Sequence, residues 1–419
     1  MTESTHPKYR VGLIGCGLMG TTHARAYNEN PSTVVVAAVD PDQANLDQFC
    51  QRFDSVQGYR TYDEMFANED LDIVAPVLPV SINADAVVAA AKAGASAIFC
   101  EKPIAASLQD ADRMVEACLT EGVKFACGDA FRNLSQFWRA KEIFDSGDLG
   151  EIKTINLYDS TAEISGGGCQ GLSLVRLFTQ DADVDWVVGW VSDDPWSDDD
   201  QRMGGVIRFT NGVTAHVHDQ SVAKRGIEVI AESGIFYSDY NSFRLWREVA
   251  QLTKTQPSQL EEDQDLLPQS DVFHTSYDSE GWRVTTQRTA DSIQSIVDSL
   301  DHGIDPRCTG DNMRKVLEIA IGLRESHRQG HQPVKFPLQD RSLALYPRPS
   351  RWLNKKELLG ESQYAETFEV IKQLRPYEPK YFIDWGGSLI WLQLDKINTK
   401  ILNDIRKIGM PTVLVNHDS

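Results

Sequence analysis

The sequence predicts an α/β domain built on a parallel sheet, followed by an α+β domain with a large, mostly antiparallel sheet. Three observations lead to this prediction. Short apolar strands alternate with helical patterns over residues 1–127, which is typical of a parallel sheet. Many short β-like runs then follow one another over residues 152–246, with turns such as Asn211-Gly212 between them, which favours hairpins. The length of 419 residues also exceeds what one compact domain accommodates.

Composition and charge exclude several classes of protein. The formal net charge of −20 argues against a nucleic-acid partner, because phosphate binding needs clustered Lys and Arg. The longest apolar runs are strand-sized and the start, MTESTHPKYR, is polar, so we expect neither a membrane span nor a secretory signal. The 7 cysteines form no CxxC pair and no metal-ligand spacing with histidine. We therefore expect reduced thiols, no bound metal and a cytoplasmic protein.

A glycine-rich turn joins the first predicted strand, residues 9–14, to a helical pattern. In the stretch GCGLMG that follows this strand, Gly15 permits a tight turn, Gly17 lets the backbone approach a pyrophosphate, and Gly20 lets helix and strand pack closely. The N–H groups at the start of the helix would then face the phosphates. These features predict a Rossmann domain that binds a dinucleotide.

An acidic residue ends the second predicted strand, residues 34–39. The carboxylate of Asp40 can accept hydrogen bonds from both ribose hydroxyls, and it would repel a 2′-phosphate. No arginine stands beside it. We therefore expect NAD rather than NADP as the cofactor.

The stretch Glu101-Lys102-Pro103 follows another predicted strand of this domain. Ligands bind at the carboxyl ends of the strands in a parallel sheet, and Lys102 lies at such an end. The Lys102–Pro103 bond is a candidate for the cis isomer. Three further strands and two helices complete the expected pattern: strands 73–78, 97–100 and 124–127, and helices 85–93 and 108–121.

These motifs resemble the Gfo/Idh/MocA family of oxidoreductases. The similarity is carried by IGCGLMGTTHARAY, by Asp40 and by CEKPIAAS, and it covers roughly residues 8–360. It implies a two-domain, NAD(P)-dependent enzyme acting on sugars or cyclitols, in which Lys102 touches both the nicotinamide ribose and the substrate hydroxyl. The cofactor contacts that we expect are Gly15, Gly17, Leu18, Met19, Gly20, Asp40, Pro79, Asn83, Glu101 and Lys102.

The glycine run GGGCQGLSLVRLF, residues 166–178, is where the sequence departs from that family. In the family, such a segment opens a helix that carries an Asp and, one turn later, the His that accepts the proton from the substrate hydroxyl. Aligned on the glycines, these two positions are Leu172 and Arg176. An arginine stays protonated and cannot act as a base, but its fork of donors can bind a carboxylate or polarise a carbonyl.

The hypothesis that we favour is an NAD-dependent dehydrogenase that oxidises a hydroxyl of a sugar, cyclitol or sugar acid, or reduces the keto form. Lys102 is the expected acid–base group, and burial together with the neighbouring charge of Arg176 would help it to lose its proton near neutral pH. Arg176 would orient the substrate, with Arg132 and Gln170 as further contacts.

Two alternatives stay open. In one, a different residue supplies the base, either His218, which shares a strand face with His216, or a carboxylate among Asp129, Asp159 and Glu163. In the other, the chain binds NAD without net dehydrogenation, either as a redox-assisted glycosidase or lyase or as a non-catalytic NAD-binding paralogue.

We place the NAD-binding domain at residues 1–127, the substrate and oligomerisation domain at 128–375 and an appendage at 376–419. The second domain includes predicted helices at 134–146, 284–300 and 311–329, the last of which packs back on the core. In that last helix the periodicity places Arg314, Glu318 and Arg324 in water. The acidic stretch DDPWSDDDQR is predicted to be a solvated turn.

The appendage shows a strand pair, an amphipathic helix and a closing strand, which together predict a β–α–β unit. It is similar to the C-terminal end of the GlcE subunit family of FAD-linked glycolate oxidases. No flavin-binding region accompanies this similarity, so we expect no flavin and predict a role in interaction or oligomerisation. A homo-oligomer, dimer or tetramer, formed through the second-domain sheet is expected, with a small carbohydrate-like molecule as substrate.

Overall fold

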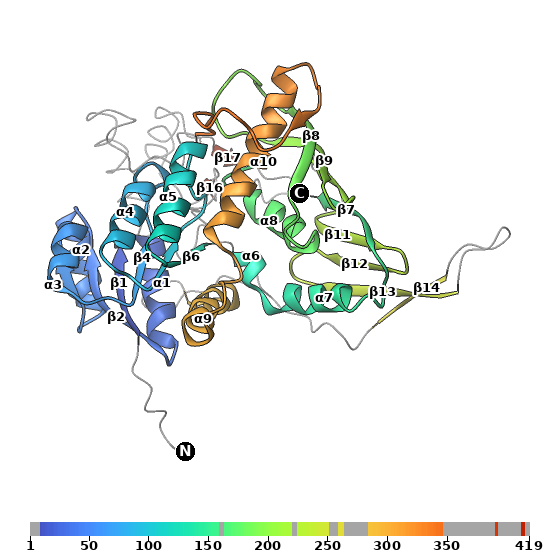
Figure 1. The fold of residues 1–419 in the computed structure, drawn as a ribbon. Coiled ribbons are helices and arrows are strands. Elements are labelled where there is room, and N and C mark those ends of the chain that lie inside the picture. The colour runs from blue at the N-terminus through green and yellow to red at the C-terminus, as the bar shows by residue number, and fades with distance from the viewer. Residues whose placement is uncertain are drawn as a thin grey trace.

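A computed structural model describes the chain in eight segments: residues 9–128, 130–158, 163–219, 224–250, 259–263, 284–346, 390–392 and 412–414. Two sheets, each with its own helices, lie side by side (Figure 1). The first sheet is built from the N-terminal part of the chain and the second from the middle part. This arrangement confirms the predicted order of an α/β unit followed by an α+β unit.

The first sheet has six parallel strands in the order β3-β2-β1-β4-β5-β6, which is the strand order of the Rossmann fold. Short apolar runs form its centre, so Val11, Leu13 and Ile73 are completely buried. The strands are β1 Tyr9–Ile14, β2 Thr33–Val39, β3 Gln57–Tyr59, β4 Ile73–Pro76, β5 Ala97–Cys100 and β6 Lys124–Cys127.

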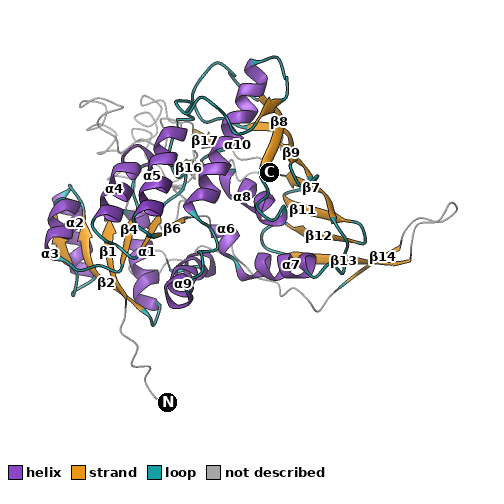
Figure 2. Ribbon diagram, in the orientation of Figure 1, coloured by secondary structure: helices purple, strands orange, loops and turns teal. Residues whose placement is uncertain are grey.

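Five helices connect these strands (Figure 2). Side chains of Asp42, Thr61 and Ser107 accept hydrogen bonds from N–H groups of the first turns of α2, α3 and α5, as expected of N-cap residues. By contrast, no side chain caps the start of α1. The helices are α1 Leu18–Glu29, α2 Gln43–Arg52, α3 Tyr62–Asn68, α4 Val80–Lys92 and α5 Leu108–Thr120.

The second sheet has nine strands in the order β14-β13-β12-β11-β7-β10-β9-β8-β15. Only its β7–β10 pair is parallel, so the predicted, mostly antiparallel sheet is confirmed. The strands are β7 Ile152–Tyr158, β8 Val184–Val191, β9 Met203–Phe209, β10 Thr214–His218, β11 Gly226–Ala231, β12 Gly234–Ser238, β13 Phe243–Ala250, β14 Gln259–Glu262 and β15 Val334–Lys335.

In the described part of the chain, helices cover one face of this second sheet and none covers the opposite face, which we call the open face (Figure 1). Strand residues that face the helices, such as Leu157 and Val229, are fully buried, whereas their neighbours Tyr158 and Ile230 are half-buried, as the alternation of side chains along a strand requires. The helices of this part are α6 Ala130–Asn133, α7 Ser135–Asp145, α8 Cys169–Phe178, α9 Gln287–His302 and α10 Gly310–Arg328.

Two late helices link the sheets. Ile293 and Ile296 of α9 pack into the core of the first sheet beside Val11 and Leu13, although the sequence analysis assigns this helix to the second domain. Helix α10 contacts α5 of the first unit as well as α8 and β8 of the second (Figure 1). The chain therefore returns to its N-terminal sheet after building the second one.

The expectation that Glu318 and Arg324 of α10 face water is wrong, since their exposed fractions are 4% and 0%. A later segment covers this side of the helix. Glu318 Oε1 accepts hydrogen bonds from the backbone N–H of Leu338 at 2.8 Å and from Arg341 at 2.6 Å, and Arg324 donates to the main-chain oxygen of Ala344 at 2.7 Å. Helical periodicity alone cannot reveal a covering segment that arrives from elsewhere in the chain.

The remaining expectations concern thiols, membranes and the appendage. All 7 cysteines are free, and six of them are buried. Among the described helices, none combines the length and apolar character needed to cross a membrane. In the appendage, β16 Ile390–Leu392 and β17 Thr412–Leu414 pair in parallel. The rest of residues 376–419 lies outside the described part.

Candidate functional site

The glycine turn after β1 has the shape that a dinucleotide needs. Gly15 has φ +105°, and a Cβ on Gly20 would lie 1.8 Å from the oxygen of Gly15, so neither position tolerates a side chain. A Cβ on Gly17 would meet no atom within 4 Å. The first turn of α1 contains no acidic residue and no capping side chain. Leu18 and Met19 begin this helix, whose N-terminus is therefore suited to a pyrophosphate.

Asp40 lies at the end of β2, beside this turn. Its carboxylate accepts hydrogen bonds from the backbone N–H groups of Cys16 at 2.9 Å and of Asp42 at 2.8 Å. Burial raises the pKa of the Asp40 carboxyl, and the backbone hydrogen bonds oppose that rise. A carboxylate oxygen has more than one acceptor site, so Asp40 can still accept from ribose hydroxyls. These residues fit the NAD that the sequence predicts.

Glu101 anchors the main chain of Lys102 at the end of β5. Glu101 Oε1 lies 2.8 Å from Nε2 of His23, and Oε2 accepts a hydrogen bond from the N–H of Lys102 at 3.1 Å. Burial alone would raise the pKa of the Glu101 carboxyl, but His23 and Lys102 hold it below its ordinary value. The Lys102–Pro103 bond is cis, as expected. His23 was missed by the sequence analysis, because a histidine inside a helical pattern carries no distinctive signal.

Asn83 and Pro79 belong to the same corner of the first unit. Pro79 is the N-cap of α4, and the fully buried amide of Asn83 donates to the main-chain oxygens of Glu101 at 3.4 Å and Ile104 at 3.2 Å. Asn83 thus supports the turn that carries Lys102. Direct contact of either residue with a cofactor stays a prediction.

The side chain of Lys102 reaches the glycine run of the second unit. Lys102 Nζ donates to the main-chain oxygen of Gly166 at 3.3 Å. Helix α8 begins three residues later at Cys169, and the half-buried Gln170 is its second residue. The structure therefore brings Lys102 together with the start of α8, where the predicted substrate contact Gln170 is found.

Arg176 lies two turns further along α8 and points into the core. It is 2% exposed, and its donors bond to the side-chain oxygen of Asn312 at 2.9 Å and to the main-chain oxygens of Ala182 at 3.2 Å and Asp181 at 3.1 Å. Burial lowers the pKa of this guanidinium, and the carboxylate of Asp181 opposes the shift. The prediction that Arg176 orients substrate is not supported, because its donors bond within the protein.

Leu172 is completely buried as well. The alignment on the glycines therefore places the family's Asp and His positions, Leu172 and Arg176, on the core side of α8. The contact of Lys102 with this segment falls before the helix, at the main-chain oxygen of Gly166.

Arg132 also belongs to the core rather than to an open site. It is 3% exposed and donates to the main-chain oxygens of Arg307 at 2.7 Å and Ser173 at 3.0 Å, and to the carboxylate of Asp181 at 2.6 Å. Asn312 Oδ1 accepts from Arg132 as well, at 3.3 Å. The two predicted substrate-binding arginines are thus linked to each other through Asn312 and Asp181.

His218 lies on the open face of the second sheet, away from α8. Its ring stacks on Tyr158 with 4.7 Å between the centroids, and the hydroxyl of Tyr158 donates to Glu228 at 3.2 Å. Burial lowers the pKa of His218, and His216 adds to this effect. Because Leu157 and Val217 fill the opposite, helix-covered face, His218 is not brought together with Lys102.

The carboxylates named as alternative bases have different positions. Glu163 is 1% exposed, and its main-chain oxygen accepts from the N–H groups of Gly167 at 3.1 Å and Gly168 at 2.9 Å in the turn before α8. Asp129 and Asp159 lie outside the described residues. Their predicted roles stay untested.

Asp200 is the residue of the acidic stretch whose position the sequence analysis missed. It has an exposed fraction of 0% and accepts a hydrogen bond from the N–H of Gly166 at 2.7 Å. The expected solvated turn therefore holds for Asp198 and Asp199, which are exposed, but not for Asp200 and Gln201, which are buried. A run of aspartates gives no signal that distinguishes one buried member from the others.

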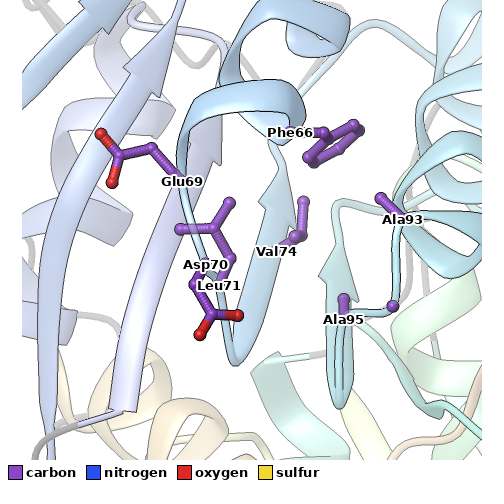
Figure 3. A pocket seen from close by; sticks show the side chains of 8 residues that line it. Phe66, Glu69, Asp70, Leu71, Val74, Ala93 and Ala95 are labelled. Atoms are coloured by element: carbon purple, nitrogen blue, oxygen red, sulfur yellow. The ribbon is translucent and has the colours of Figure 1, made fainter.

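A pocket elsewhere in the first unit lies away from these residues (Figure 3). It is formed where β4 begins, whereas the glycine turn, Asp40 and Lys102 follow the carboxyl ends of strands, where ligands bind in this fold. Within the described residues, no group of three or more His, Cys, Asp and Glu side chains is placed to hold a metal ion. The pocket is lined by Phe66, Glu69, Asp70, Leu71, Val74, Ala93, Gly94 and Ala95.

Comparison with curated proteins finds relatives that share part of this chain. A D-apiose dehydrogenase of Paraburkholderia graminis is 34% identical over 131 residues, which are 31% of this chain and 35% of that protein. A 2,7-anhydro-N-acetylneuraminate hydratase of Mediterraneibacter gnavus is 30% identical over 140 residues, which are 33% of this chain and 36% of that protein. The chain thus spans little more than a third of the length of these relatives.

A solved structure shares the whole two-unit architecture. The oxidoreductase of Agrobacterium radiobacter, in complex with NAD+, L-tartaric acid and magnesium, superimposes with a TM-score of 0.62 at 20% identity, covering 78% of this chain and 98% of that one. At this identity the likeness establishes the fold. Residues 9–129 match the model of the oxidoreductase family with an NAD-binding Rossmann fold. Over these residues the chain resembles the Gfo/Idh/MocA oxidoreductases, as the sequence motifs indicate, and the matched model describes an NAD-binding Rossmann fold.

Proposed function

We propose that this chain is an NAD-dependent dehydrogenase that oxidises a hydroxyl group of a sugar, cyclitol or sugar acid, or reduces the corresponding keto form. The observation that carries the proposal is the position of Lys102. Its main chain is held by Glu101, which also contacts His23 of α1, and its Nζ lies 3.3 Å from the oxygen of Gly166 in the second unit. A reacting hydroxyl between the two units would meet this amine.

Gly15, Gly17, Gly20 and Asp40 would hold the cofactor, and bound NAD supplies the acceptor for the hydride. Lys102 is the proposed acid–base group: in its amine form, Nζ takes the proton of the substrate hydroxyl, and in its ammonium form it returns a proton to the keto oxygen. A positioned general acid or base contributes about 10²–10⁴-fold to the rate.

Gln170, a predicted substrate contact, is the second residue of α8 and is half-buried. Its amide can donate to one hydroxyl and accept from another, but it cannot remove a proton. We infer that it orients the substrate while Lys102 alone exchanges the proton. An acidic substrate receives less support than a neutral polyol, because the donors of Arg132 and Arg176 bond within the core.

The test combines purified chain, NAD and a panel of sugars, cyclitols and sugar acids, with NADH formation as the readout. Lys102→Ala should reduce turnover by about 10²–10⁴-fold and leave the dissociation constant for NAD within a few-fold of the wild-type value. Lys92→Ala, at an exposed lysine of α4, is the matched control and should change neither.

Each other outcome counts against the proposal in a distinct way. Turnover that survives Lys102→Ala overturns the role of the lysine. Cleavage of an aryl glycoside or dehydration of a sugar without net NADH places the chain in the redox-assisted class to which the hydratase name of one relative points. Tight NAD binding with neither reaction leaves a non-catalytic NAD-binding protein.

We also propose that the open face of the second sheet joins subunits into a homo-oligomer. This face carries aromatic and aliphatic side chains that remain half-buried or exposed in the single chain, and an apolar face of this kind marks an interaction site. A face that pairs with its own copy is the commonest arrangement in homodimers. Its apolar members are Tyr158, Trp186, Val188, Trp190, Val206, Ile230, Ile235, Tyr237 and Trp246.

A further inference from the structure

Asp200 is a fully buried carboxylate that faces the start of the glycine run. Its oxygens accept hydrogen bonds from the hydroxyl of Ser165 at 2.6 Å, from the N–H of Ser165 at 3.1 Å and from the N–H of Gly166 at 2.7 Å. A buried carboxylate is costly unless donors surround it. The three donors all come from two consecutive residues, so they fix the direction of that short segment.

The segment that carries Asp200 is itself held on both sides. The N–H of Asp200 donates to the main-chain oxygen of Tyr346 at 2.7 Å. The N–H of Tyr346 in turn donates to the main-chain oxygen of Asp198 at 2.8 Å. On the other side, the N–H of Ile164 donates to the main-chain oxygen of Gln201 at 3.0 Å. Asp200 therefore reaches the glycine run from a rigid support rather than from a free loop.

Gly166 connects Asp200 to the proposed catalytic lysine. Its N–H donates to Asp200, and its carbonyl oxygen accepts from Lys102 Nζ at 3.3 Å. We propose that Asp200 is a positioning residue for Lys102: it sets the place of the Gly166 carbonyl, which in turn holds the ammonium group at the carboxyl edge of the Rossmann sheet. This inference rests on the proposed acid–base role of Lys102.

Asp200→Asn removes the negative charge and one of the two acceptor oxygens while it keeps the size of the side chain. An amide has nearly the same volume, but its NH2 group is a donor and would face the N–H and O–H donors of Ser165 and Gly166. The main chain at Gly166 must then shift to relieve this conflict. A misplacement of about 1 Å in a catalytic group can reduce the rate by about 10²-fold.

The experiment compares four variants in the full chain: Asp200→Asn, Asp200→Glu, Ser165→Ala and, as matched control, Asp199→Asn at the exposed neighbour. For Asp200→Asn we expect kcat to fall about 10–100-fold, with KM and the dissociation constant for NAD within a few-fold of wild type. Ser165→Ala should give a smaller fall, because it removes one of three donors. Asp200→Glu retains the acceptor and should recover part of the rate, and Asp199→Asn should match wild type.

A second readout does not require turnover. Acetylation of Lys102 by N-acetoxysuccinimide, measured by peptide mass spectrometry relative to Lys92 in the same sample, reports how firmly the ammonium group is held. Loss of one hydrogen bond to a charged group corresponds to about tenfold to 100-fold faster labelling in Asp200→Asn. If the wild-type chain oxidises no polyol, the proposed function fails, whereas this labelling difference still tests the link between Asp200 and Lys102.

Two results would overturn the inference. One is an Asp200→Asn variant with wild-type kcat and wild-type labelling of Lys102. The other is a variant whose thermal stability and NAD affinity fall together while the labelling of Lys102 stays unchanged, since Asp200 would then support only the fold.

Discussion

The ammonium group of Lys102 and the carbonyl oxygen of Gly166 lie 3.3 Å apart, although 64 positions separate these residues in the sequence. This contact joins the Rossmann unit to the glycine run of the second unit. It identifies the start of α8, rather than its later turns, as the part of that helix beside the lysine.

The glycine turn predicts a contrast between two equally small substitutions. A Cβ on Gly17 meets no protein atom, whereas a Cβ on Gly20 lies 1.8 Å from the oxygen of Gly15. Gly17→Ala should keep the wild-type melting temperature and weaken NAD binding about tenfold or more, because the methyl group occupies the pyrophosphate approach. Gly20→Ala should lower the free energy of unfolding by about 3 kcal/mol or more.

Calorimetric titration with NAD and thermal unfolding measure the two effects separately. If Gly17→Ala binds NAD as tightly as wild type, the pyrophosphate does not pass over Gly17. If Gly20→Ala is as stable as Gly17→Ala, the close packing of α1 on β1 is not required.

Arg176 predicts an effect on stability rather than on specificity. Arg176→Met removes the hydrogen-bond partner of three oxygens, the buried one of Asn312 and the partly buried ones of Ala182 and Asp181. We expect the free energy of unfolding in urea to fall by about 3–5 kcal/mol. Arg139→Met removes an exposed pair with Glu142 and should cost less than about 1 kcal/mol. A changed KM together with an unchanged free energy of unfolding would instead support a role of Arg176 in substrate binding.

The open face of the second sheet predicts that one charge dissociates the oligomer. Ile230 and Ile235 lie opposite each other on β11 and β12 and are half-buried. Ile230→Arg places a cation in the proposed interface, so light scattering after gel filtration should show a monomer. Leu119→Arg, at a side chain that is 80% exposed on α5, is the control and should retain the wild-type mass. A monomeric wild-type chain, or an unaffected Ile230→Arg variant, contradicts the proposal.

His327 predicts a loss of stability on mild acidification. Its Nδ1 accepts a hydrogen bond from the N–H of Val191 at 2.9 Å, and burial together with the neighbouring His331 lowers the pKa of the ring from 6.5. The folded chain therefore binds fewer protons at His327 than the unfolded chain does. The stabilisation is present above pH 6.5 and is lost as the pH falls through the lowered value.

Unfolding in urea at a series of pH values tests this expectation. His327→Asn keeps an acceptor for Val191 but does not titrate, so its stability should depend less on pH over this window. His302→Asn, at an exposed histidine, should retain the wild-type dependence. Identical pH profiles for wild type and His327→Asn would show that this histidine does not contribute.

Much of the cofactor half could be predicted from the sequence because its signals are local. Gly15, Gly17 and Gly20 owe their roles to backbone geometry within one turn, and Asp40 follows from its position at the end of a strand. The parallel sheet also follows from local alternation of strands and helices. The substrate half could not be predicted in the same way. An arginine such as Arg132 or Arg176 looks the same in the sequence whether it binds a ligand or an acceptor inside the protein.

The sequence by itself therefore determined the Rossmann unit, its preference for NAD and the position of Lys102 at the carboxyl edge of the sheet. Only the tertiary structure decided which residues meet that lysine. In the folded chain, Arg176 is buried against Asn312 and His218 lies on the open face of the second sheet. Asp200 accepts a hydrogen bond from Gly166 of the glycine run. The physical reason is that these contacts join segments distant in sequence, and burial, rather than residue type, determines which polar groups remain available to a substrate.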